Sequence, residues 1–170
     1  MPEGLDGSRR ELQAQTDLHE RALREFLQTI EPWTDDSLAQ PLAADATWTN
    51  RKILGHVVGC IYLPYFDWML KKLELDPVPR PFSDDREEAN RYLQGVDSIA
   101  RWRQLLEAAV PYVRAVTAQM TDNDLGKEFP CAWGDRYSID QMFEHATMHL
   151  YRHIRQLERD RAVKAAVVRE

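Results

Sequence analysis

The sequence predicts an all-α fold, a helical bundle within a single domain that takes in residues 1–170. Apolar side chains recur at steps of three and four residues along four long stretches, as in amphipathic helices. No long stretch alternates apolar and polar residues as a half-buried strand does. The 170 residues, 44% of them hydrophobic, suffice for one hydrophobic core. These observations together favour a bundle of four long helices.

The first helix is expected over about residues 9–30. Its apolar positions are Leu12, Leu18, Ala22, Leu23, Phe26, Leu27 and Ile30. His19 lies between these positions and is expected to be an exposed or edge residue. Pro32 and the polar segment that follows interrupt the pattern, which predicts a connection ending near Trp48 and Thr49.

The second helix is expected over about residues 50–73, with Thr49 as its N-cap. Its apolar face is formed by Ile53, Val57, Cys60, Ile61 and Trp68. Pro64 lies inside this stretch and is expected to kink or divide the helix, because proline has no amide hydrogen to donate.

Three prolines, Pro77, Pro79 and Pro81, predict an extended loop after the second helix. A short helix is expected over residues 84–94, before Gly95. The third long helix is expected over residues 96–120, where apolar residues again recur at helical spacing and Pro111 is the interruption.

Residues 125–137 contain Gly134-Asp135 between aromatic side chains and are interpreted as a loop or a small hairpin. Ser138 and Gln141 then form a capping-box pattern, which predicts the start of the last helix. This helix is expected to continue to about Val163. Its apolar stripe consists of Ile139, Phe143, Ala146, Leu150, Ile154 and Leu157.

Composition excludes some classes of function. The formal net charge of -6 argues against a nucleic-acid binder, because affinity for phosphate backbones depends mainly on Lys and Arg. Cys60 and Cys131 lie far apart and form neither a CxxC zinc motif nor a disulfide framework, which suits a reducing cytoplasm. Residues 1–10 lack the apolar stretch of a secretory signal, and no run was found long enough to span a bilayer. The expectation is a soluble cytoplasmic protein with no membrane partner.

The histidines are the candidate functional residues. His145, His149 and His153 are four residues apart, and residues at that spacing lie one turn apart on one side of a helix. Neutral imidazole binds zinc, nickel, copper and iron, and three such ligands leave a coordination position for water or substrate.

A helical wheel at 100° per residue distinguishes the three. His153 borders the apolar stripe of the last helix, His149 lies about 100° from its centre, and His145 is turned roughly 140° away. The last helix therefore supplies two ligands, His149 and His153, with His145 at the surface or beside the ligands. His56 on the second helix can face the pair and supply the third. The alternative interpretation is that these histidines are ordinary solvated or buried side chains.

Two segments resemble a known family. Residues 52–58 (KILGHVV), preceded by Trp48, and residues 149–157 (HLYRHIRQL) are similar to the two signatures of the DinB-like superfamily. The resemblance covers almost the whole chain. It implies a four-helix bundle with a long crossover connection, a divalent metal ion, and frequently a homodimer. The positions that match the family's metal site and the glutamine after it are His56, His149, His153 and Gln156.

The resemblance implies less about the reaction. Some relatives activate a low-molecular-weight thiol, such as bacillithiol or mycothiol, for transfer to a small electrophile. A metal-dependent thiol S-transferase is therefore one hypothesis, and whether the site is catalytic stays open. The alternatives are a non-enzymatic metal-binding stress-response protein, a metal-dependent hydrolase, and a helical dimerisation module without metal. Zinc, nickel and other first-row transition metals all suit three histidines.

Several other residues have open roles. Arg155 departs from the resemblance, since relatives often have glycine before the glutamine, and it can fill space or add positive charge. Cys60 is interpreted as a packed core thiol ahead of a fourth ligand or a redox partner. Asp67 and Glu144 are candidates for acid–base or supporting groups. Candidates for the walls of a pocket, or for core positions, are Trp48, Tyr62, Tyr65, Trp133 and Tyr151.

Overall fold

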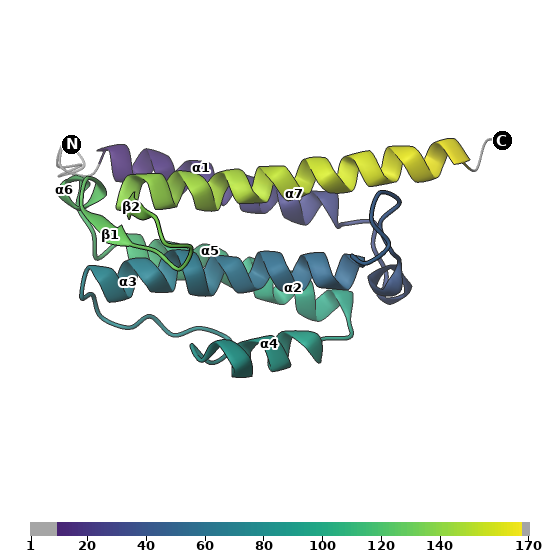
Figure 1. Ribbon diagram of the computed structural model, residues 1–170, viewed down its shortest axis with the longest axis horizontal. Helices are drawn as coiled ribbons and strands as arrows, with labels where there is room; N and C mark the ends of the chain where they lie inside the picture. Colours follow the sequence, from purple (N-terminus) through teal and green to yellow (C-terminus); the bar gives the residue numbers. More distant parts are fainter. Residues whose placement is uncertain (1–9, 168–170) are drawn as a thin grey trace, which may run out of the picture.

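The computed structural model describes residues 10–167 and confirms the all-α architecture (Figure 1). All four predicted long helices are present. The expected start of the first helix, Arg9, lies outside the described residues. In chain order the elements are α1 (Arg10–Thr29), the 3-10 helix η2 (Asp35–Ala39), α2 (Asn50–Cys60), the π-helix η3 (Ile61–Asp67), α3 (Trp68–Lys72), α4 (Arg86–Gln94), α5 (Ile99–Thr117), α6 (Asp122–Leu125), β1 (Glu128–Pro130), β2 (Arg136–Ser138) and α7 (Ile139–Val167).

The bundle has the long crossover connection that the sequence resemblance implied. Figure 1 shows α1 and α7 running in one direction, while the continuous α2–η3–α3 helix and α5 run in the other. Because α3 and α5 belong to parallel neighbours, the chain between them must return along the whole bundle. Residues 73–98 make this return and include α4, which packs against α2.

The predicted helix starts are confirmed by their hydrogen bonds. The hydroxyl of Thr49 accepts from the amide of Lys52 at 3.3 Å, which caps α2. At the start of α7, the amide of Gln141 donates to Ser138 Oγ at 3.1 Å. The amide of Ser138 in turn donates to Gln141 Oε1 at 3.0 Å. This reciprocal pair is the capping box, and it fixes where α7 begins.

Pro64 interrupts the second helix as expected, but it neither divides nor ends it. Proline cannot donate to the preceding turn, and the seven residues of η3 around it adopt the wider π-helical hydrogen-bond pattern. The helix then resumes as α3. The second helix is therefore one continuous rod with a local change of winding.

This rod corrects one expectation. Asn50–Lys72 is 23 residues long and apolar enough to cross a membrane by length and composition, contrary to the expectation that no run is long enough. Most of its apolar stretch, 61%, is buried inside the structure. Its apolar character is therefore explained by its place among the other helices, as for the core helix of a soluble protein.

The segment before α7 is a small hairpin rather than a loop. β1 and β2 are antiparallel, with Phe129 opposite Tyr137. Trp68 Nε1 donates to the carbonyl of Pro130 at 3.1 Å, which ties the hairpin to α3. The hairpin thereby lies beside α3 (Figure 1), and Trp133 in its connection packs against the ring of His145 on α7.

His19 is not at an edge, contrary to the expectation from the sequence. Its side chain is 0% exposed and lies edge-on to Phe66 and Phe143, with Nδ1 3.1 Å from Thr147 Oγ1. Leu18, which was assigned to the apolar stripe, is instead 44% exposed. The reason is the wheel of α1, on which residues 12, 16, 19, 23 and 26 form the buried seam at alternating steps of four and three.

Candidate metal centre

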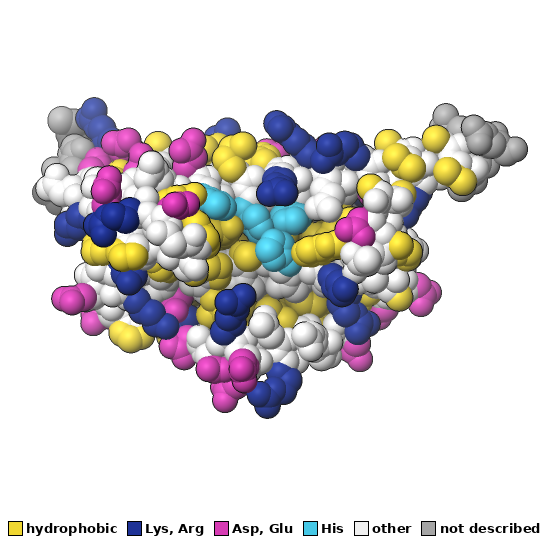
Figure 2. Space-filling view, in the orientation of Figure 1, with side chains coloured by type: hydrophobic (Ala, Val, Ile, Leu, Met, Phe, Trp, Pro, Cys, Tyr) yellow, Lys and Arg dark blue, Asp and Glu magenta, His cyan; other side chains and the backbone are white. Residues whose placement is uncertain are grey.

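Three histidine side chains from two helices converge on the same face of the bundle. His149 Nε2 lies 2.8 Å from His56 Nε2, and His153 Nε2 lies 3.2 Å from His149 Nε2. Figure 2 shows histidine side chains gathered near the middle of this face, between hydrophobic side chains. The structure thus brings together the residues that the spacing and the resemblance singled out.

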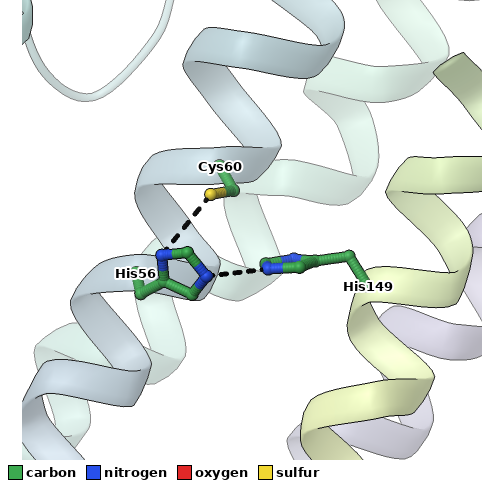
Figure 3. A group of neighbouring side chains, drawn as sticks. All are labelled: His56, Cys60 and His149. Carbon is green, nitrogen blue, oxygen red and sulfur yellow. Dashed lines mark hydrogen bonds between the residues drawn. The ribbon is translucent and has the colours of Figure 1, made fainter. Parts of the chain in front are cut away.

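The two helices position these side chains in different ways. His149 and His153 are one turn apart on α7, and their rings lie edge-on to each other with centroids 4.6 Å apart. His56 projects from α2 toward them, and Figure 3 shows its ring facing that of His149. Trp48, in the loop before α2, lies edge-on to His56 with ring centroids 5.7 Å apart. The tryptophan of the sequence signature therefore packs directly against the first histidine.

Gln156 orients His153. Its Oε1 lies 2.8 Å from His153 Nδ1, so Nδ1 carries the hydrogen and donates it. Nε2 is then left with its lone pair directed at the other two imidazoles. This is the usual arrangement for a metal-binding histidine, whose second nitrogen donates to a neighbouring acceptor. His149 Nδ1, in contrast, is buried with no hydrogen-bond partner among the described residues.

The electrostatics of the cluster favour neutral imidazoles. Burial, and then the neighbouring His153 and His56, lower the pKa of His149 to about 3. Burial likewise lowers the pKa of His153 to about 4, and burial and the positive charge of Arg152 lower the pKa of His56. All three rings are therefore unprotonated near pH 7, which is the form that binds a metal ion.

Cys60 lies one turn after His56 on α2. Its Sγ is 3.7 Å from His56 Nδ1, and one donor atom from each of His56, Cys60 and His149 lies within 4.8 Å of the others (Figure 3). Burial raises the pKa of the thiol to about 11. Cys60 is half-buried, packs against the core as expected, and also lines the cleft. His56 and His149 are thus shared by two donor sets, one completed by His153 and the other by Cys60.

The cluster lies in a cleft of about 860 Å³. Of the aromatic side chains considered as pocket walls, Trp48, Tyr65 and Trp133 line this cleft. Tyr62 belongs to the core, where its hydroxyl donates to the carbonyl of Leu105 at 2.9 Å. Tyr151 lies outside the cleft. Arg152 and Arg159 also line the cleft, as do Asp45 and Asp160.

His145 is the histidine of α7 that stays out of the nitrogen cluster. Its ring lies 5.5 Å from that of Tyr65, 5.4 Å from that of Trp133 and 5.7 Å from that of Tyr137. It is half-buried and lines the cleft next to His149. The helical wheel correctly separated His145 from His149 and His153. Its aromatic neighbours belong to the hairpin and η3, so no pattern within α7 predicts them.

Three further candidates do not line the cleft. Asp67 forms ion pairs with Lys71 at 2.8 Å and Arg80 at 2.7 Å. Glu144 is exposed and does not line the cleft. Arg155 is exposed and borders a neighbouring surface hollow that shares Arg152 and Arg159 with the cleft, but it does not line the cleft itself.

The donor set suits a first-row transition metal. In a tetrahedral zinc site with Zn–N bonds of about 2.0–2.1 Å, the nitrogens lie roughly 3.3 Å apart. The observed separations of 2.8 and 3.2 Å are within about half an ångström of this value. Carboxylates are absent from the cleft's nitrogen cluster among the described residues, and such an all-nitrogen set disfavours magnesium and calcium.

Comparisons with known proteins agree with this fold. The structure resembles the crystal structure of a mycothiol-dependent maleylpyruvate isomerase, with a TM-score of 0.64, 13% identity, and coverage of 86% of this chain and 60% of that one. A mutant of that isomerase matches equally well at 14% identity. A conserved protein from Enterococcus faecalis matches with a TM-score of 0.61 and 14% identity, over 88% of this chain and 94% of that one.

These likenesses show the fold, and the chain spans only about 60% of the length of the isomerase chains. No curated protein matches the sequence. A family model for the DinB superfamily matches residues 18–157, which include the nitrogen cluster and all four long helices except for their ends. The chain therefore belongs to the DinB superfamily.

Proposed function

We propose that this protein binds one divalent first-row transition-metal ion through His56, His149 and His153 and uses it to activate a low-molecular-weight thiol for reaction with a small electrophile. The observation that carries the proposal is the convergence of the three Nε2 atoms inside the cleft. A thiol partner is supported by the structural likeness to a mycothiol-dependent isomerase.

The residues of the site have separate roles in this proposal. A divalent ion held by neutral ligands keeps its full charge and lowers the pKa of a bound thiol. Gln156 keeps the lone pair of His153 Nε2 directed at the ion by accepting from Nδ1. Trp48 and Tyr65 flank the imidazoles and exclude water from one side of the cluster.

The cleft indicates the chemistry of its substrates. A volume of about 860 Å³ is within the usual range for small-molecule sites, roughly 300–1,000 Å³. Its aromatic walls suit apolar parts of a ligand, and Arg152 and Arg159 suit a carboxylate. We therefore expect at least one of the two reactants to carry a carboxylate group.

Metal content tests the first half of the proposal. Untagged wild-type protein should contain about one divalent ion per chain by inductively coupled plasma mass spectrometry, and His149→Ala should contain none. The matched control is His145→Ala, because His145 is on the same helix and lines the same cleft but lies outside the nitrogen cluster. Equal metal loss in both variants, or no metal in the wild type after incubation with zinc or nickel, contradicts the proposed site.

Thiol consumption tests the second half. Metal-loaded protein should accelerate the reaction of mycothiol or bacillithiol with monochlorobimane, and chelated protein should not. A protein that binds the ion but leaves these thiols unreacted with a range of electrophiles is better described by a second function, non-enzymatic metal binding. The observation that favours this alternative is the thiol of Cys60 beside the nitrogen cluster.

The proposal also includes the setting of the protein. Both cysteines of the described residues are free thiols, in agreement with a reducing cytoplasm. We propose a homodimer as the assembled form, and light scattering coupled to size-exclusion chromatography measures it. A monomeric mass at micromolar concentration removes the dimer without affecting the metal site.

A further inference from the structure

Cys60 is the side chain of the cleft whose chemistry the three-histidine site does not use. It follows His56 by one turn of α2, so both side chains project toward α7 from the same face. Figure 3 shows the thiol above the ring of His56, with His149 facing that ring from the other helix. The distance from Sγ to His56 Nδ1 is 3.7 Å.

Cys60 Sγ lies beside His56 Nδ1, whereas the histidine cluster uses His56 Nε2, so a shared ion requires the Cys60 side chain to rotate toward the Nε2 side of the ring. With a Zn–S bond of about 2.3 Å and Zn–N bonds of about 2.0–2.1 Å, sulfur and nitrogen lie roughly 3.6 Å apart in a tetrahedral site. The donor atoms of His56, Cys60 and His149 already lie within 4.8 Å of one another. Cysteine has a single side-chain torsion that moves its sulfur, so rotating it costs little conformational entropy.

The surroundings of Cys131 differ from those of Cys60. Cys131 lies in the hairpin connection, where its Sγ donates to the carbonyl of Asp135 at 3.1 Å. Its interaction is with backbone, and it does not line the cleft. Cys60 Sγ, in contrast, lies against an imidazole nitrogen.

We propose that Cys60 Sγ is the fourth protein donor to the ion held by His56, His149 and His153, which gives a resting site of three nitrogens and one sulfur. This inference rests on the metal site of the proposed function. Without an ion, burial favours the neutral thiol, whereas an ion in the cluster favours the thiolate by direct bonding.

A fourth protein ligand changes what the site does. Thiolate is a soft donor, so it favours zinc and cobalt over harder ions such as manganese. It also fills the coordination position that three histidines alone leave open. A substrate thiol then competes with Cys60 for that position, and removing the Cys60 sulfur should make the thiol reaction faster.

Cobalt substitution of the full-length protein separates this inference from the proposed function. Cobalt(II) in a protein site gives visible ligand-field bands with any ligands, but a near-ultraviolet charge-transfer band only with thiolate. The wild type loaded with one equivalent of cobalt should show both features. Cys60→Ser should keep the visible bands and lose the charge-transfer band, and the control Cys131→Ser should keep both.

Each of the other outcomes refutes either ligation by Cys60 or the metal site as a whole. Visible bands without a charge-transfer band in the wild type refute ligation by Cys60 and leave the three-histidine site intact. A charge-transfer band that survives in Cys60→Ser also refutes it. Absence of bound cobalt in the wild type refutes the metal site itself, and the inference with it.

Alkylation of the thiols provides a second readout that does not depend on spectra. Zinc should slow the reaction of Cys60 with iodoacetamide at least tenfold relative to chelated protein, as measured by peptide mass spectrometry. Cys131 in the same sample is the internal reference and should react at the same rate in both states. Equal rates for Cys60 with and without zinc contradict ligation.

Discussion

His19 and His149 have nearly the same electrostatic state and very different surroundings. Burial lowers the pKa of each to about 3, and each has one ring nitrogen with no hydrogen-bond partner among the described residues. The remaining nitrogen of His19 lies against the hydroxyl of Thr147, between phenylalanine rings. The remaining nitrogen of His149 lies against two other imidazoles in an open cleft.

The difference shows what distinguishes a candidate site from a core position. A lowered pKa reports removal from water, which both residues share. Only His149 belongs to a group of ring nitrogens that point toward one position, and a ligand can reach that position from the cleft. The convergence of donor atoms therefore identifies the candidate metal centre, and a perturbed pKa by itself does not.

Removing each ring in turn and measuring zinc affinity tests most strongly whether His149, but not His19, binds the metal ion. Structural zinc sites with four ligands bind with roughly 10–16 kcal/mol, so one ligand contributes about 3–4 kcal/mol. His149→Ala should therefore weaken zinc binding by about a few hundredfold in a competition titration with a chromophoric chelator. His19→Leu should bind zinc as the wild type does, and a large loss in that variant would show that the core position also controls the site.

Stability of the metal-free protein should rank the two residues in the opposite order. His19→Ala leaves a cavity among packed phenylalanine rings and should lower the free energy of unfolding by about 2–3 kcal/mol. His149→Ala removes a ring that borders an open cleft and relieves crowding of imidazoles. It should therefore lower the free energy of unfolding by less than about 1 kcal/mol. Urea denaturation in the presence of a chelator measures both, and equal losses would contradict the distinction.

Gln156 tests how finely the cluster is oriented. Gln156→Leu keeps the volume of the side chain but removes the acceptor of His153 Nδ1. Loss of such a supporting hydrogen bond typically weakens metal binding 10- to 100-fold, so we expect about tenfold weaker zinc binding. Gln141→Leu is a control elsewhere on α7, since Gln141 bonds the amide of Ser138 at the helix start. An unchanged affinity in Gln156→Leu would remove its orienting role.

The smallest effect concerns pH. The pKa of His19 is about 3 in the folded protein and about 6.5 in the unfolded chain, so below pH 6.5 the unfolded state takes up the proton and the folded state does not. His19 therefore costs no stability above pH 6.5 and a growing amount as the pH falls toward 3. Between pH 6.5 and 5.5 this amounts to about 1 kcal/mol.

His19→Leu removes this dependence from the core while retaining the other histidines. In chelated protein, its free energy of unfolding should fall about 1 kcal/mol less than that of the wild type between pH 6.5 and 5.5. The difference between the two proteins isolates His19, because His149 and His153 contribute equally to both. Parallel pH profiles would indicate that His19 is protonated in the folded state.

Local patterns in the sequence predicted the helix starts and the ligand candidates. Thr49 and the Ser138–Gln141 pair act within one turn, so neighbouring residues are sufficient to identify them. His149 and His153 are likewise related by a single helix. The helical wheel and the family resemblance placed His56 in the same cluster, and the structure confirms that it lies against His149.

The surroundings of His19, Cys60 and His145 were not fully predicted. They depend on contacts between distant segments or on which side of a helix is buried. The alternation of residues 12, 16, 19, 23 and 26 is sufficient to predict the buried side of α1, but the expectation for His19 was an exposed or edge position. Cys60 packs against the core as the sequence predicts, but its place on the wall of the cleft depends on how α2 faces α7. The aromatic surroundings of His145 depend on the hairpin.

The π-helical turn around Pro64 has a consequence for aligning this chain with its relatives. A π-helix holds more residues per turn than an α-helix, so the seven residues of η3 shift the angular position of every residue that follows them. A relative whose second helix is α-helical throughout would need a gap at this point to align its later positions. Positions counted forward from His56 correspond up to Cys60, whereas Asp67 and Trp68 must be matched from the far end of the helix.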